Sequence, residues 1–126
     1  DHPAQLIGVL DWEMATIGDP LLDLGCSLAY WIEAGDPPEF AAARMLPTQL
    51  PGSLSREEVL ARYARASGRE VGDFRFQRVF GLFRLAVIVQ QIYYRFFHGQ
   101  TRDERFRGLG SMAAVMLARA LAEAGA

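Results

Sequence analysis

The stretch Leu6-Ile7-Gly8-Val9-Leu10-Asp11-Trp12-Glu13 decides how the rest of the chain is interpreted. It is a short run rich in Val, Ile and Leu that ends in a carboxylate, and this pattern predicts a buried strand over 6–10. An acid at the carboxyl end of such a strand lies where open sheets present ligands for metals and phosphates. An acid inside the strand would be charged and unsatisfied. We therefore expect the side chain of Asp11 to face a cleft.

A second motif, Gly18-Asp19-Pro20 followed by Asp23-Leu24, comes directly after the first. Together the two motifs resemble the carboxyl-terminal lobe of the aminoglycoside phosphotransferase and choline kinase-like family. Within that family, the likeness is to the branch linked to acyl-CoA dehydrogenases. The resemblance implies a mainly α structure, the helical carboxyl-terminal lobe of a protein-kinase-like α+β fold with one short amino-terminal strand. It also implies Mg²⁺-dependent transfer of a phosphoryl group from ATP to a hydroxyl group of a small molecule.

Three acids have candidate roles, two from the resemblance and that of Glu13 from strand geometry. Asp11 is similar to the aspartate of the protein-kinase D-F-G motif, which holds Mg²⁺ against the nucleotide phosphates. Glu13 would point to the same side as Asp11 if strand geometry continued, and could then bind a second ion or orient a metal-bound water. Asp23 is expected in the mostly buried first turn of a helix, and we favour bracing of the catalytic loop over interaction with the free N–H groups of that helix end. A single D-W-E is a weak motif, and a strand-end acid bonded to backbone N–H groups is the alternative for Asp11.

Several parts of a kinase are not found in these 126 residues. There is no lysine to bind the phosphates, and no glycine-rich phosphate loop. Relatives carry a catalytic loop with the base shortly before the D-W-E motif, but only ten residues precede Asp11. We therefore expect residues 1–126 to be a partial carboxyl-terminal lobe that is inactive alone.

Composition limits the classes of partner. A formal net charge of -2 and an isoelectric point near 5.7 do not favour nucleic acid or an anionic membrane as a partner. The single Cys26 cannot form an internal disulfide, which fits a cytoplasmic protein. Charged and amide side chains interrupt the apolar stretches well short of 18 residues, so no membrane span is expected.

Apolar periodicity and capping signals predict four main helices. The expected ranges are 20–33 after Asp19, about 56–68 after a capping box of Ser55 and Glu58, about 73–98, and about 109–123. The third helix is apolar nearly all round and should lie at the centre of the lobe. Trp31 and Arg95 are the candidate substrate-binding residues, the latter because a guanidinium suits a phosphate or carboxylate.

Two questions stay open from the sequence. The acceptor could be a hydroxyacyl thioester, which the resemblance favours, or an aminoglycoside, a choline-like amino alcohol or a homoserine-like compound. The protein could instead be a pseudokinase, or a non-catalytic helical module that binds an acyl ligand or a protein partner. An incomplete lobe would expose apolar surface, so association with a second copy as a homodimer is also expected.

Overall fold

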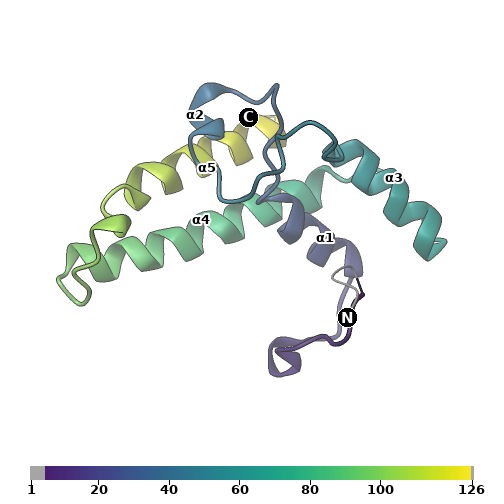
Figure 1. Cartoon of the computed structure of the whole chain (residues 1–126). Helices are drawn as coiled ribbons and strands as arrows, with labels where there is room; N and C mark the ends of the chain where they lie inside the picture. Colours follow the sequence, from purple (N-terminus) through teal and green to yellow (C-terminus); the bar gives the residue numbers. More distant parts are fainter. Residues whose placement is uncertain (1–4, 126) are drawn as a thin grey trace.

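Residues 5–125 are described by the computed structural model, and they form a mainly helical structure built on two long antiparallel helices (Figure 1). The mainly α fold class is therefore confirmed. Within these residues no helix combines the length and the apolarity needed to cross a membrane. The helices are α1 (Pro20–Leu28), α2 (Pro38–Ala41), α3 (Arg56–Ser67), α4 (Arg75–Phe97) and α5 (Leu109–Ala124), with short 3-10 turns η1 (Trp12–Met14) and η2 (Glu104–Phe106).

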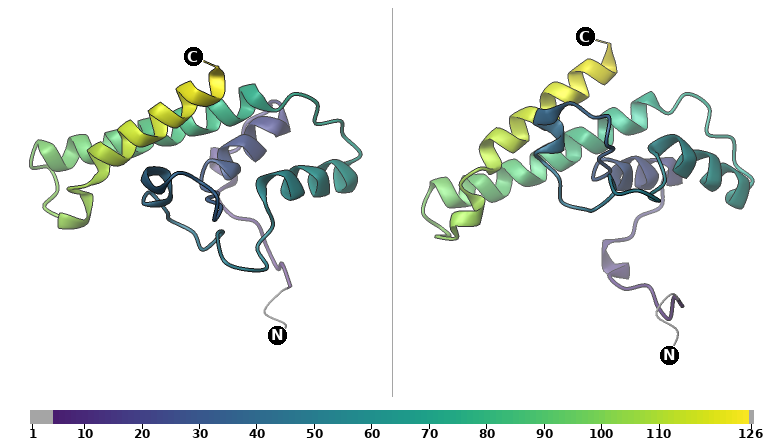
Figure 2. Two further views of the ribbon diagram at one scale, coloured as in Figure 1. Left: turned by 90° about the horizontal axis from the view of Figure 1, so that it is seen from above. Right: turned by 45° about the horizontal axis from the view of Figure 1, so that its top comes forward.

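The central helix is α4, as predicted. It packs along α5 on one side and is crossed by α1 near its amino-terminal half, whereas α3 extends away from this group (Figure 2). The core lies between α4, α5 and the loop region after α1. Its buried members are Ala29, Ile32, Phe40, Ala43, Leu82, Leu85, Ala86, Val89, Ala113, Met116 and Ala120.

The crossing of α1 over α4 is a contact between backbones. A Cβ atom placed on Gly81 of α4 would lie 2.2 Å from the carbonyl oxygen of Gly25 in α1. A Cβ atom on Gly25 would lie 2.3 Å from the carbonyl oxygen of Gln77. Since real Cβ atoms do not approach other atoms this closely, the two helices can meet here only with glycine at both positions.

The predicted helix ends are confirmed where the signal is local. The capping box is complete, because Ser55 Oγ accepts from the N–H of Glu58 at 3.1 Å and the Glu58 carboxylate accepts from the N–H of Ser55 at 2.7 Å. Gly68 ends α3 in the left-handed conformation with φ of 67°. The predicted cap Asp73 lies one residue before Phe74, the N-cap of α4, and its carboxylate accepts from the N–H of Arg75 at 3.0 Å.

Helix α1 is shorter than predicted, because it ends at Leu28 and not near Glu33. The N–H of Ile32 donates to the hydroxyl of Thr48 at 2.9 Å, and that hydroxyl donates back to the carbonyl of Ile32 at the same distance. A residue distant in sequence thus takes the backbone groups that would have continued the helix.

The predicted buried strand over 6–10 is wrong. Residues 5–10 form no strand, and no strand occurs elsewhere in residues 5–125. The side chains of Leu6, Ile7 and Leu10 are 82%, 95% and 84% exposed. An extended segment becomes a strand only when its N–H and C=O groups pair with a neighbouring strand, and no described residue supplies one. Residues 5–19 are called the amino-terminal arm below.

A buried arginine ties α3 to the loop that follows α1. The guanidinium of Arg56 donates to the carbonyl oxygen of Trp31 at 2.8 Å, to Glu33 at 3.1 Å, and to the carboxylate of Asp36. Burial alone would raise the pKa of Asp36, but hydrogen bonds from Arg56 and from the N–H of Glu33, with the charges of Arg56 and Arg119, hold that pKa below its ordinary value. Arg56, Glu33 and Asp36 are called the Arg56 cluster.

Candidate functional site

Asp11 lies at a sharp turn in the arm. It is the only non-glycine residue among residues 5–125 with a positive φ, at 62° with ψ of 35°. This left-handed conformation ends the extended run and leads the chain into η1, which is closed by a bond of 3.0 Å from the N–H of Ala15 to the carbonyl of Trp12. Backbone in this region is disfavoured for most residues and recurs at functional sites.

The carboxylate of Asp11 is exposed and forms no ion pair with any described residue. It lies on the arm and lines none of the pockets discussed below, so the expectation that it faces a cleft is not met among residues 5–125. Glu13 is also exposed. The alternation expected of a strand is lost at Asp11, because the chain turns there into η1, so the geometric reason for placing both acids on one side is wrong.

Asp11 and Glu13 are the acids of the arm that were predicted as Mg²⁺ ligands. Among the described residues, no group of three or more His, Cys, Asp or Glu side chains is arranged to hold a metal ion. Magnesium, however, usually keeps several waters and is bound in kinases through one or two carboxylates together with substrate phosphates. An exposed carboxylate without a competing cation, as at Asp11, fits that shared kind of site.

Asp23 lies in the first turn of α1 and is exposed, so the expectation that this acid is buried is wrong. Capping of α1 is done by Asp19, whose carboxylate accepts from the N–H of Leu21 at 2.9 Å. Asp23 instead lines an open cleft of about 480 Å³ between α1 and α4. The other residues of this α1–α4 cleft are Cys26, Ser27, Tyr30, Trp31, Leu46 and Arg84.

Trp31 reaches the same cleft and is fixed in place. Its indole N–H donates to the carbonyl of Leu54 at 2.7 Å, so the ring is held by the segment that leads into α3. Because its one donor is already used, the indole offers the cleft an apolar surface. Arg84 was not among the predicted site residues. The sequence signal for Arg84 is that α4, from Arg75 to Phe97, contains no acid, so no residue of the same helix can pair with its guanidinium.

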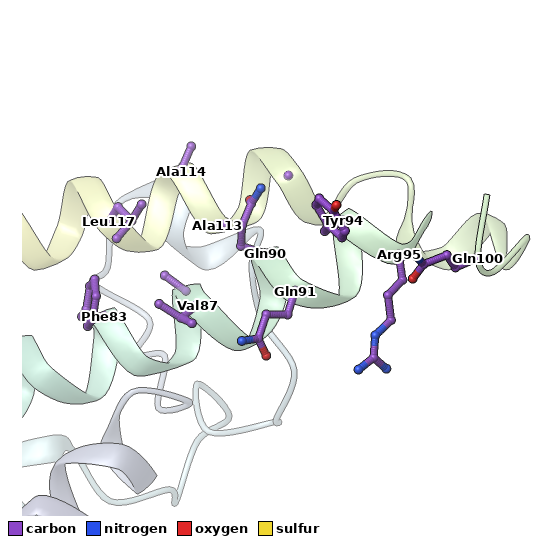
Figure 3. Close-up of a pocket in the computed structure, with 12 residues that line it drawn as sticks. Phe83, Val87, Gln90, Gln91, Tyr94, Arg95, Gln100, Ala113, Ala114 and Leu117 are labelled. Carbon is purple, nitrogen blue, oxygen red and sulfur yellow. The ribbon is translucent and has the colours of Figure 1, made fainter. Parts of the chain in front are cut away.

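Arg95 lies elsewhere. It is on α4, in a groove of about 700 Å³ between α4 and α5, and its guanidinium extends away from α5 (Figure 3). The residues lining this α4–α5 groove also include Phe83, Ala86, Val87, Gln90, Gln91, Tyr94, Gln100, Gly110, Ala113, Ala114 and Leu117. The structure therefore brings Asp23 and Trp31 together, and separates them from Arg95 in the groove and from Asp11 and Glu13 on the arm.

The sequence is similar to one protein family and to several curated proteins. Residues 1–74 match the model of the phosphotransferase enzyme family. A probable acyl-CoA dehydrogenase IBR3 from Arabidopsis thaliana is 33% identical over 95% of this chain and 15% of its own length. Acyl-CoA dehydrogenase family member 10 from Mus musculus is 32% identical over 91% of the chain and 11% of its own length. Family member 11 from Homo sapiens is 31% identical over 82% of the chain and 14% of its own length. No solved structure gives a significant match.

Proposed function

The chain belongs to the phosphotransferase enzyme family, and on this premise we propose that it forms part of an ATP- and Mg²⁺-dependent kinase that phosphorylates a hydroxyl group of a small molecule. The observation that carries the proposal is Asp11. Its carboxylate is exposed and forms no ion pair within residues 5–125, its backbone is left-handed, and it lies within the matched residues 1–74. Because the chain spans only 11% to 15% of the length of its relatives, the activity is proposed for the longer catalytic protein.

In the proposed mechanism each acid has a separate task. Asp11 would hold Mg²⁺, and Glu13 stays a predicted ligand of a second ion or of a metal-bound water, although the turn at Asp11 removes the strand geometry that placed it on the same side. When bound, Mg²⁺ neutralises the charge that develops on the transferring phosphoryl group. Asp23, exposed at the start of α1, accepts hydrogen bonds from the catalytic loop and positions it. Since the 126 residues contain no lysine, the group that holds the nucleotide phosphates comes from other residues of the catalytic protein.

The α1–α4 cleft is the proposed contact for the acceptor. Trp31 presents an apolar ring whose donor is occupied, and such a ring can pack against an acyl chain. The names of the relatives are those of acyl-CoA dehydrogenases, and they support a hydroxyacyl thioester as the leading acceptor. Aminoglycosides, choline-like amino alcohols and homoserine-like compounds are the other candidates. Arg95 stays a predicted anion contact, in the separate α4–α5 groove.

The test is Mg²⁺-dependent ATP turnover by the longer protein that contains this chain. We expect Asp11→Ala to lower kcat about 100-fold or more, since loss of a metal ligand removes several kcal/mol of transition-state stabilisation. The matched control is Glu70→Ala, which removes an exposed acid between α3 and α4 and should leave turnover unchanged. Unchanged turnover in Asp11→Ala would remove this residue from the mechanism.

A second candidate function is a pseudokinase or non-catalytic binding module. The α4–α5 groove favours it, because exposed apolar surface of this extent is typical of a docking surface. ADP release separates the two functions. A kinase releases ADP with at least one of the acceptors named above, whereas a pseudokinase releases none, whether or not it binds ATP with Mg²⁺.

A further inference from the structure

Trp31, which lines the α1–α4 cleft, has each of its polar groups bonded to another part of the chain. Its backbone N–H donates to the carbonyl of Leu28 at 3.0 Å, and its indole N–H donates to the carbonyl of Leu54 at 2.7 Å. Its own carbonyl accepts from Nη2 and Nε of Arg56 at 2.8 Å and 3.1 Å. The indole ring is therefore fixed relative to both the end of α1 and the start of α3.

The backbone at Trp31 lies outside any helix, because α1 ends at Leu28. The next residue, Ile32, is 3% exposed and belongs to the core. Both backbone groups of Ile32 bond to the hydroxyl of Thr48, 16 positions later, and the carbonyl of Trp31 bonds to Arg56, 25 positions later. Side chains distant in sequence thus determine where this segment lies, and with it the ring that faces the cleft.

The guanidinium of Arg56 makes several of these bonds at once. Besides the carbonyl of Trp31, it donates to Glu33 at 3.1 Å and to both carboxylate oxygens of Asp36. The side chain of Arg56 is 9% exposed. A lysine ammonium carries its protons on one nitrogen and cannot reproduce this planar fork. A lysine at this position would therefore pair with the two acids at the expense of the bond to Trp31.

Stability alone does not account for an arginine buried at this place. Apolar residues of similar volume often stabilise a protein as well as a buried ion pair does. A bond to a backbone carbonyl has a different effect, because it fixes the position of one peptide group. Here the peptide group belongs to Trp31, whose ring lines the α1–α4 cleft, whereas Arg56 itself does not line it.

Arg119 provides an internal comparison for Arg56. Its guanidinium lies 3.7 Å from Asp36 and donates to Glu123 at 2.7 Å, but it makes no hydrogen bond to Trp31. The two guanidinium groups also lie over the same ring, at 6.0 Å for Arg56 and 5.6 Å for Arg119 from the centroid of Phe40. The two arginines therefore share an acid and a ring, and they differ in the bond to Trp31.

We propose that Arg56 is a positioning residue for the acceptor. By bonding to the carbonyl of Trp31, it sets the indole ring against which the apolar part of the acceptor packs. This inference rests on the proposed function, since it takes the α1–α4 cleft as the contact for the acceptor. Arg56 touches neither the acceptor nor the nucleotide, so its replacement weakens acceptor binding and leaves the transfer step of the bound complex unchanged.

The first test is steady-state ADP release by the longer protein that contains this chain, with hydroxyhexanoyl-coenzyme A as acceptor. We expect Arg56→Lys to raise the KM for the acceptor about fivefold or more, while kcat and the KM for ATP change by less than about twofold. The matched control Arg119→Lys disturbs the pairing with Asp36 and the contact with Phe40 and should leave the KM for the acceptor unchanged. Asp36→Asn keeps Arg56 and removes one charge that orients it, so a smaller rise of the same KM is expected. This variant also provides the comparison in case Arg56→Lys does not fold.

The second test reports on Trp31 without turnover. The longer protein is labelled with fluorotryptophan, and the fluorine resonance of position 31 is assigned by its loss in Trp31→Phe. Arg56→Lys should shift this resonance, because the ring is released from one of its attachments, whereas Arg119→Lys should leave it in place. The spectrum thereby separates a change at the ring from a general loss of stability, which unfolding measurements on both variants record.

The outcomes distinguish this inference from the proposed function. Equal rises of the acceptor KM in the two lysine variants, or an unmoved Trp31 resonance in Arg56→Lys, would overturn the inference. A moved resonance with an unchanged acceptor KM would also overturn it, because Trp31 would then not contact the acceptor. Absence of ADP release with every acceptor named above would instead remove the proposed function, and the fluorine spectra would still decide whether Arg56 positions Trp31.

Discussion

Replacement of Arg56 by alanine should be among the most damaging single changes to this structure. The guanidinium is buried, and it connects the first residue of α3 to the loop after α1 through Trp31, Glu33 and Asp36. Its loss leaves the carboxylate of Asp36, whose side chain is 5% exposed, without its main partner. The expected effect is therefore that of breaking a buried ion pair and not that of removing a surface charge.

The magnitude follows from what remains near Asp36. Removal of one partner from a buried pair costs about 3–5 kcal/mol of unfolding free energy. Arg119 lies 3.7 Å from Asp36 and offsets part of the charge, so we expect the lower end, about 3 kcal/mol. Arg62→Ala on the same helix removes an exposed arginine and should change the free energy by less than about 0.5 kcal/mol.

The assay is urea unfolding followed by circular dichroism at 222 nm, with the free energy obtained by linear extrapolation. Adding Asp36→Asn to Arg56→Ala should recover part of the loss, because the uncompensated charge is then removed. A loss below about 1 kcal/mol for Arg56→Ala, or no recovery in the double variant, would refute the view that the Arg56 cluster anchors α3.

Three further changes test other parts of the structure. Because the pKa of Asp36 is lowered by folding, its contribution to stability is complete above the pKa of the unfolded carboxyl and is lost as the pH falls through the folded pKa. The urea concentration at the unfolding midpoint should thus decrease as the pH is lowered below about 4, and it should decrease less in Asp36→Asn. The same pH dependence in both proteins would contradict this assignment. Gly81→Ala should destabilise by about 1–3 kcal/mol in thermal unfolding, despite a gain in helix propensity, since its Cβ atom would lie 2.2 Å from the backbone of Gly25. A stabilised variant would disprove the close crossing. Ser55→Ala should cost about 1 kcal/mol by opening the capping box, and an unshifted melting temperature would argue against it.

The sequence predicted features that depend on neighbouring residues. The capping box at Ser55 and the start of α4 after Asp73 were correct, because the bonds that form them join residues two or three positions apart. The end of α1 was wrong because Thr48, distant in sequence, binds the backbone of Ile32. The strand over 6–10 was wrong for the same reason, since pairing requires a partner that local patterns do not reveal.

The candidate site was predicted in part. Asp23 and Trp31 lie eight residues apart and line one cleft, whereas Arg95 belongs to another surface. The exposed apolar face of α4, on which Phe76, Phe83 and Phe97 are 53% to 69% exposed, was not predicted, although its signal is present in the sequence. Between Phe76 and Phe97 apolar residues occur on nearly all sides of the helix, so the four-and-three spacing of the exposed face was not separated from the core face. Only the contacts of α4 with α1 and α5 divide these two faces.

The glycine crossing makes α1 and α4 behave as one mechanical unit. Where Gly25 meets Gly81, no side chain lies between the helices to rotate or yield, so sliding of one helix would at once drive carbonyl groups into the other backbone. The arm with Asp11 continues directly into α1, and the hairpin of α4 and α5 continues from the other side of the crossing. A displacement of α4 and α5 should therefore also move α1, and with it the end of the amino-terminal arm near Asp19.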